Sequence, residues 1–82
     1  MRLMHELKIQ KEYLTRLISG EKKSEIRCND RDYQLGDVLR FMDNGRAFDF
    51  KITHIHSGLG LKDGYVVLSV AQLNDNTLNR EG

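Results

Sequence analysis

The residues best suited to ligand recognition lie between Gly20 and Arg27, where the sequence reads Gly-Glu-Lys-Lys-Ser-Glu-Ile-Arg. Glu25 and Arg27 have the same parity, so on a strand their side chains point to one face with Cα atoms about 6.6 Å apart. A carboxylate accepts hydrogen bonds from the exocyclic amine of a base, and a guanidinium binds phosphate or carbonyl groups. The pair could therefore recognise a nucleobase. The alternative is a solvated strand face with an internal ion pair worth about 0–1 kcal/mol.

Lys22 is the third charged residue of this segment, and its parity is opposite to that of Glu25 and Arg27. Its side chain joins theirs only if the strand begins after Lys22 or if a bulge re-aims it.

The charge of the chain limits which nucleic acids it could bind. The formal net charge is +1, and residues 21–32 contain four basic and four acidic side chains. Binding a long polyanion by bulk charge requires an excess of Lys and Arg, which is missing here. The balance favours contact with a specific base, a nucleoside or a short single-stranded segment.

Aromatic side chains beside the charged segment could stack on bases. Tyr33 lies in the polar stretch after it, and Tyr65 opens a later apolar run. One base stacked on an aromatic ring contributes about 1–3 kcal/mol. For Tyr65, core packing with its hydroxyl at the surface is an equal alternative. Strand parity places the three phenylalanines in the core: Phe41, Phe48 and Phe50.

The other reactive side chains predict neither a metal nor a cofactor. His54 and His56 share a strand face, but His5 is the one further histidine, and a transition-metal site requires a complete ligand set. Cys28 is the single cysteine, which excludes an internal disulfide. It has no histidine at a telling offset, so a catalytic thiol is not predicted.

Apolar periodicity divides the chain into one helix and several strands. Spacings of three and four predict a helix over 11–19, packed through Leu14, Leu17 and Ile18 and capped by Gly20. Alternation predicts a short first strand with Leu3, Leu7 and Ile9 on one face. Further strands are predicted at 22–27, 38–42, 47–56 and 65–73.

Within these strands, Asn44-Gly45 signals a tight hairpin. The return strand is predicted to alternate with Phe48, Phe50, Ile52, His54 and His56 on one face. The continuous apolar run from Tyr65 predicts burial on both faces.

This order predicts a small α+β domain with a curled, mostly antiparallel sheet or open barrel, because one helix cannot support a wound parallel sheet. The chain has 82 residues, 39% of them hydrophobic, which suits one domain over 1–73 followed by a frayed polar tail over 74–82. No apolar run approaches the length of a membrane span or a signal peptide, so we expect a cytoplasmic protein with no membrane association.

The segment Gly20 to Arg27 reads G-x-K-x-x-E-x-R and resembles the signature of ASCH domains in the PUA-like superfamily. The preceding helix, the following Asp30-Arg31-Asp32-Tyr33 and Gly36-Asp37-Val38, and the closing Gly64-Tyr65-Val66-Val67-Leu68 extend the resemblance over residues 5–73. The pattern is similar to the small stand-alone, PUA-like ASCH group of bacteria and phages, which are presumed RNA-binding domains.

The resemblance implies a β-barrel flanked by a helix, with a cleft for RNA or a nucleotide lined by the motif. We therefore expect ligand binding by Lys22, Glu25 and Arg27, with Tyr33 and Tyr65 as stacking planes.

Some relatives are acetylcytidine amidohydrolases, whose nucleophile is a threonine two positions before the motif arginine. Here that position is Glu25, so hydrolysis of an acylated nucleoside is the alternative, with Glu25 activating water and Lys22 stabilising the oxyanion. ASCH modules also occur in transcription coactivators, so a protein-interaction role is a third possibility.

Overall fold

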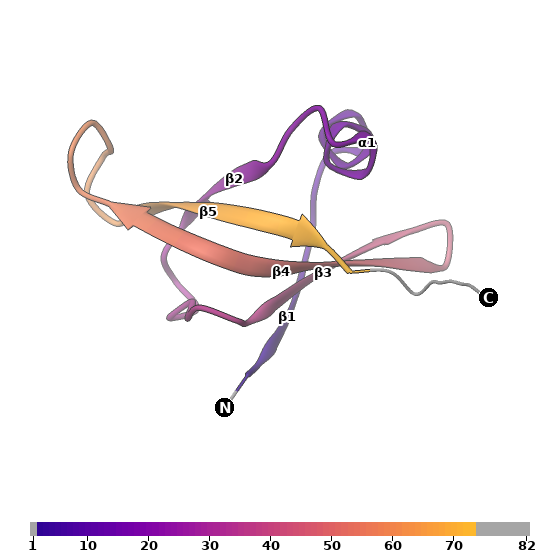
Figure 1. Ribbon diagram of the computed structural model, residues 1–82, viewed down its shortest axis with the longest axis horizontal. Helices are drawn as coiled ribbons and strands as arrows, with labels where there is room; N and C mark the ends of the chain where they lie inside the picture. The colour runs from indigo at the N-terminus through magenta and orange to yellow at the C-terminus, as the bar shows by residue number, and fades with distance from the viewer. Residues whose placement is uncertain (1, 74–82) are drawn as a thin grey trace.

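Five strands and one helix make up the described part of the chain, residues 2–73 of a computed structural model (Figure 1). Two strands flank the helix at the start of the chain, and three strands then follow one another. Their bounds are β1 Met4–Leu7, α1 Lys11–Ser19, β2 Ser24–Cys28, β3 Val38–Asp43, β4 Arg46–Ser57 and β5 Tyr65–Gln72. The predicted tail over 74–82 lies outside the described residues.

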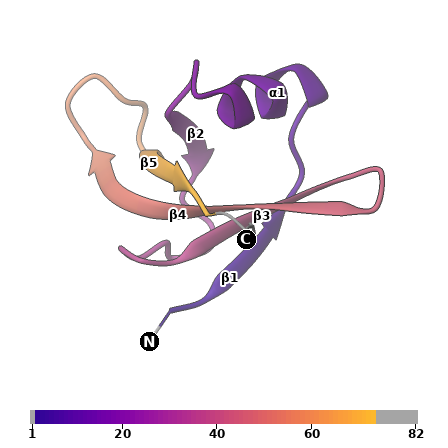
Figure 2. The ribbon, with the colours of Figure 1, turned by 45° about the vertical axis from the view of Figure 1, so that its right-hand side comes forward.

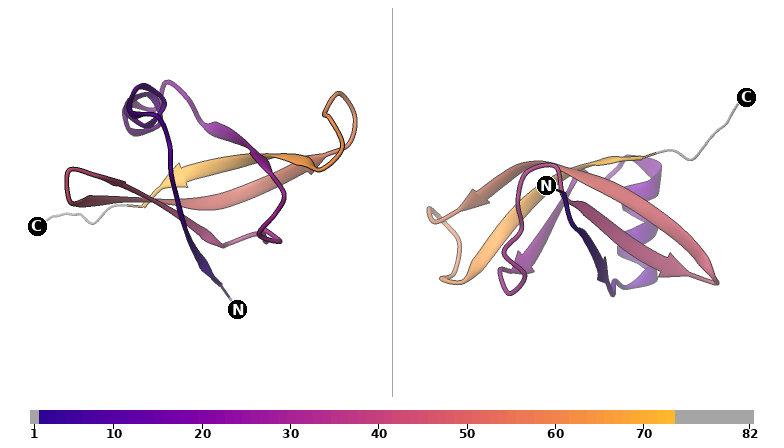
Figure 3. Two further views of the ribbon diagram at one scale, coloured as in Figure 1. Left: turned by 180° about the vertical axis from the view of Figure 1, so that it is seen from behind. Right: turned by 90° about the horizontal axis from the view of Figure 1, so that it is seen from below.

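The five strands form one mixed sheet in the order β1-β3-β4-β5-β2. β1 pairs with β3 in parallel, and the other neighbours are antiparallel. The sheet curls into a half-barrel, and α1 connects its two edge strands on the concave side (Figures 2 and 3). The predicted α+β class, with a curled sheet and one flanking helix, is confirmed. Within residues 2–73, no helix has the length and apolar character that crossing a bilayer requires.

α1 begins and ends where the periodicity predicts. Leu14 and Leu17 are 2% and 3% exposed and form the buried stripe. Gly20 follows in the left-handed region with φ 84°, and its N–H donates to the carbonyl of Leu17. The predicted packing of Ile18 is wrong, because this side chain lies beside the buried stripe and is 38% exposed.

The β3–β4 hairpin follows its turn sequence. Asp43 pairs with Arg46, and the two turn residues Asn44 and Gly45 have φ values of 52° and 78°. Positive φ at both central positions is the geometry that Asn-Gly favours in a two-residue hairpin.

A β-bulge at Thr53 overturns the predicted alternation of β4. Phe50 and Ile52 are buried, but the register with β5 shifts between Ile52 and His54. The extra residue reverses the parity, so Ile55 packs against the core while His54 turns outward. His56 is exposed by the same shift. An uninterrupted alternation predicted that both histidines share the face of the phenylalanines. Neither of them does.

The predictions for the first and last strands of the chain also need correction. β1 starts at Met4, so Leu3 precedes it and is 52% exposed, whereas His5 and Leu7 are buried. β5 is buried on one face through Val66 and Leu68, and its other face is half-covered or exposed. A single sheet with its helix on the concave side leaves the convex face of β5 in solvent.

The core fills the concave side of the half-barrel. Phe41 and Phe50 lie at its centre with ring centroids 5.9 Å apart, and the predicted core position of both is confirmed. Phe48 is half-buried and packs at the edge of the cluster. The most deeply buried apolar side chains come from β3, β4 and β5. These three strands therefore form the scaffold that supports the edge strands β1 and β2.

Candidate functional site

The carboxylate of Glu25 lies between the side chains of Lys22 and Arg27. Lys22 Nζ is 3.7 Å from Glu25 Oε1, and Arg27 Nη2 is 3.1 Å from Glu25 Oε2. Arg27 Nε also donates to Oε2 over 3.2 Å. The Glu25 side chain is 10% exposed, so this partly buried group is compensated by two cations.

The local fold explains how the three side chains meet. β2 begins at Ser24, after Lys22, so the parity of the strand does not govern the lysine. The Lys22 N–H donates to the carbonyl of Arg16, which holds the turn against α1. Glu25 and Arg27 pair with Leu68 and Val66, both buried, and so point to the concave side.

Arg27 also crosses the opening between the edge strands. Its Nη2 donates a 2.6 Å hydrogen bond to the carbonyl oxygen of Lys8, just after β1. The guanidinium carbon lies 5.8 Å from the centre of the Phe41 ring. Within residues 2–73 these contacts engage Nε and Nη2 but not Nη1, so the guanidinium retains donors for a ligand.

A cavity of about 310 Å³ lies beside Arg27, between the end of β1 and the segment after β2. This volume is at the lower end of the range for small-molecule sites. Its polar lining holds three cations and two carboxylates, together with one aromatic ring: Lys8, Arg27, Arg31, Glu6, Asp30 and Tyr33. The excess of cations suits an anionic or strongly polar ligand. Lys22 and Glu25 are not among its lining residues.

Tyr33 forms part of the cavity wall, yet its side chain is only 5% exposed. Its ring meets the edge of the His5 imidazole with centroids 4.9 Å apart. Burial raises the pKa of the Tyr33 hydroxyl, and nearby Arg27 offsets part of this rise. The Tyr33 ring is thus packed into the wall of the cavity. It is not the exposed stacking surface that the sequence predicted.

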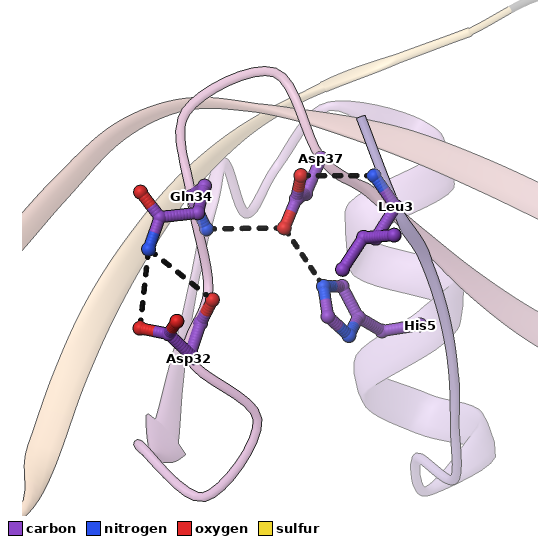
Figure 4. Close-up of polar contacts among 5 residues, drawn as sticks. All are labelled: Leu3, His5, Asp32, Gln34 and Asp37. Carbon is purple, nitrogen blue, oxygen red and sulfur yellow. Dashed lines mark hydrogen bonds and ion pairs between the residues drawn. The ribbon is translucent and has the colours of Figure 1, made fainter. Parts of the chain in front are cut away.

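A buried polar cluster around Asp37, with partners in His5, Leu3 and Gln34, was not anticipated from the sequence (Figure 4). His5 Nε2 lies 2.8 Å from Asp37 Oδ2, and Asp37 is fully buried. The backbone N–H groups of Leu3 and Gln34 also donate to this carboxylate, each over 3.1 Å. Burial alone would raise the pKa of Asp37, but the hydrogen bonds from His5, Leu3 and Gln34 together lower it. The cluster ties β1 to the loop that carries Tyr33.

Tyr65 is not brought to the cavity. Tyr65 does not line the cavity, and because it precedes Val66, which points to the core, its side chain lies on the convex face, opposite to Glu25 and Arg27. Tyr65 is 38% exposed. The core-packing alternative for its ring is wrong as well, because within residues 2–73 no layer covers this ring.

The histidines do not assemble a metal centre in the described chain. His5 is buried against Asp37, whereas His54 and His56 are exposed on β4. Among residues 2–73, no three His, Cys, Asp or Glu side chains are grouped so that they could hold a metal ion.

Comparison with known protein families identifies the family of this chain. A family described as a domain of unknown function, DUF3850, matches residues 4–70. The chain belongs to this family. The match includes the whole of β1 to β4 and therefore Lys22, Glu25, Arg27 and every residue of the cavity.

Two relatives of this DUF3850 domain are informative. An uncharacterized 12.9 kDa protein in the GpA 3′ region of Escherichia phage P2 is 30% identical over 74 residues, covering 83% of this chain and 68% of the phage protein. The crystal structure of hypothetical protein PH0355 superposes with a TM-score of 0.61 at 20% identity, over 89% of this chain and 100% of that chain. The second likeness shows that a solved structure shares this fold.

Proposed function

We propose that this DUF3850 domain is an ASCH-like, PUA-like module of the cytoplasm that binds RNA or a nucleotide in the cavity beside Arg27. The observation that carries the proposal is the position of Arg27, which lines the cavity and retains free donors while Glu25 and Lys8 hold its guanidinium in place. A pre-positioned guanidinium suits a phosphate or a base carbonyl pair.

The charge of the cavity supports the same proposal. Lys8 and Arg31 add two cations to Arg27, against the carboxylates of Glu6 and Asp30. Such a mixed lining suits one phosphate together with the donors and acceptors of a base, and not a long polyanion. The G-x-K-x-x-E-x-R motif adds the resemblance to ASCH domains.

Direct titration tests the proposal. Fluorescein-labelled single-stranded RNA and the four nucleoside monophosphates are titrated against the wild type, Arg27→Ala, Arg31→Ala and Arg46→Ala. We expect Arg27→Ala to weaken binding by about 1–3 kcal/mol, the cost of losing a charge-assisted contact. Arg31→Ala, which removes an exposed cation at the cavity, should weaken binding without disturbing the Glu25 pair.

Arg46→Ala is the matched control, because this arginine is exposed at the start of β4, and it does not line the cavity. It should bind as the wild type does. If no nucleotide or RNA binds to the wild type, or if Arg27→Ala and Arg31→Ala both fold and bind unchanged, the proposal is wrong.

Hydrolysis of an acylated nucleoside is the second candidate. The observation in its favour is the 3.7 Å separation of Lys22 Nζ and Glu25 Oε1, which places a potential base beside a cation that could stabilise an oxyanion. Against it, both Glu25 oxygens are already engaged, and the carboxylate lies outside the lining of the cavity.

A further inference from the structure

Most aromatic rings of the chain are unavailable to a base beside the motif. The sequence has three tyrosines and three phenylalanines and no tryptophan. Three of these rings are buried: Tyr33, Phe41 and Phe50. Phe48 is half-buried under Arg46, whose guanidinium carbon lies 5.1 Å from its centre. Tyr65 lies on the convex face of the sheet.

The remaining ring, Tyr13, lies beside the motif. It is on the exposed flank of α1, and it is 41% exposed. Lys22 Nζ lies over the ring, 5.8 Å from its centre, and the Arg16 guanidinium carbon lies over it at 6.0 Å. A base that stacks on this ring therefore replaces one of the two cations. The hydrogen bond from the Lys22 N–H to the Arg16 carbonyl sets this arrangement, because it fixes the turn after α1 along the same flank.

A chain of short contacts connects this ring to the cavity. Lys22 approaches Tyr13 on one side and Glu25 on the other, and Glu25 in turn contacts Arg27 at the cavity. Tyr13 and the cavity are therefore linked through Lys22, Glu25 and Arg27, and the Glu25 side chain between them is 10% exposed. Tyr13 does not line the cavity, so a ligand that fills only the cavity does not contact the ring, and contact with both requires a longer ligand.

We propose that Tyr13, flanked by Arg16 and Lys22, is a base-stacking platform for single-stranded RNA; this inference rests on the proposed function of the cavity. Exposed aromatic rings set among cations are the usual means of holding single strands, with the ring against a base and the cations near the backbone. Lys22 has three donors, so its contact with Glu25 leaves donors for a phosphate. The ligand is accordingly an oligonucleotide and not a mononucleotide.

The test compares Tyr13→Ala, Tyr13→Phe, Tyr13→Leu and Tyr65→Ala in titrations with a labelled single-stranded RNA of about ten nucleotides, within the usual site size. Mononucleotide binding is measured in parallel. We expect Tyr13→Ala and Tyr13→Leu to weaken RNA binding about 5- to 150-fold, the contribution of one stacked base, and to leave mononucleotide binding unchanged. Tyr13→Phe, which keeps the ring, should bind within about 2-fold of the wild type.

Tyr65→Ala is the matched control, since Tyr65 has nearly the same exposure as Tyr13 but lies on the opposite face of the sheet. It should bind RNA as the wild type does. Unchanged RNA binding by a folded Tyr13→Leu variant overturns the stacking platform, and so does equal weakening by Tyr13→Phe. If Arg27→Ala still weakens binding in the same assay, the cavity proposal survives without the platform. If the wild type binds neither RNA nor mononucleotides, both proposals are wrong.

Discussion

Arg27 on β2 and Lys8 just after β1 are joined across the opening of the half-barrel by a hydrogen bond from Nη2 to the carbonyl oxygen. The same guanidinium holds Glu25, so one side chain both fastens two edge strands and faces the candidate ligand cavity. The proposed binding role and the stabilising role of Arg27 therefore fall on one side chain and must be measured separately.

Arg27→Ala should lower the free energy of unfolding by about 1–3 kcal/mol, because it removes a hydrogen bond to Lys8 and leaves the partly buried Glu25 with Lys22 alone. Urea denaturation of Arg27→Ala, Glu25→Gln and the double variant measures the coupling, which should be about 0.5–3 kcal/mol for residues in contact. Additive losses would contradict the ion pair. Arg46→Ala serves as the charge control.

Asp37 should make the stability of the domain sensitive to acid. The pKa of Asp37 is lowered from its ordinary value of 3.8, so its stabilising effect is complete above that value and is lost as the pH falls through the lower folded-state pKa. Asp37→Asn should cost about 1–3 kcal/mol at neutral pH, since it weakens a buried hydrogen-bond network. The difference between wild type and variant should shrink below about pH 4.

Urea denaturation at several pH values between neutrality and pH 2.5 checks this dependence. The exposed Asp63, which lies in the loop before β5, provides a matched Asp63→Asn control with little effect at any pH. A constant difference between wild type and Asp37→Asn over the whole range would rule out the lowered pKa.

The two apolar neighbours at the end of α1 should respond differently to truncation. Leu17→Ala should destabilise the domain by about 2–5 kcal/mol, because Leu17 is 3% exposed in the core. Ile18→Ala should cost much less, because Ile18 is 38% exposed. Thermal and chemical denaturation of the two variants give the comparison, and equal losses would mean that the helix packs in another orientation.

Acetylcytidine hydrolysis should be slow or absent. A hydroxyl nucleophile on the concave face requires Thr or Ser at position 25, and this chain has Glu25 there. Ser24 pairs with Ser69 and points to the other face, so it cannot replace that nucleophile. The assay incubates pure protein with acetylcytidine and follows the release of cytidine. Rapid turnover that disappears in both Glu25→Ala and Lys22→Ala would favour the enzyme over the binding module.

The elements whose structure depends on residues close in the sequence could be predicted from the sequence. The span of α1, its glycine cap and the Asn-Gly hairpin follow from short-range periodicity and turn chemistry, and all three agree with the structure. The bulge at Thr53 could not be predicted, because it exists only relative to the register of β5. It reversed the expected direction of His54 and Ile55.

The surroundings of the candidate site depend on contacts between distant segments. His5 and Asp37 are 32 positions apart, and neither has a sequence signature that indicates the other. The motif itself could be found in the sequence, but the environment of each aromatic ring could not. Tyr33 is a buried wall of the cavity, whereas the exposed ring beside Lys22 is Tyr13 on α1.

The strand order has a consequence for how the chain is made. β1 and β2 are synthesised early, but they pair with β3 and β5, which are synthesised later. During translation, the strand that carries Glu25 and Arg27 therefore emerges from the ribosome long before its partner. The meander of β3, β4 and β5 must form first because its pairings are local. The edge that carries the candidate site is completed only after β5 has been released.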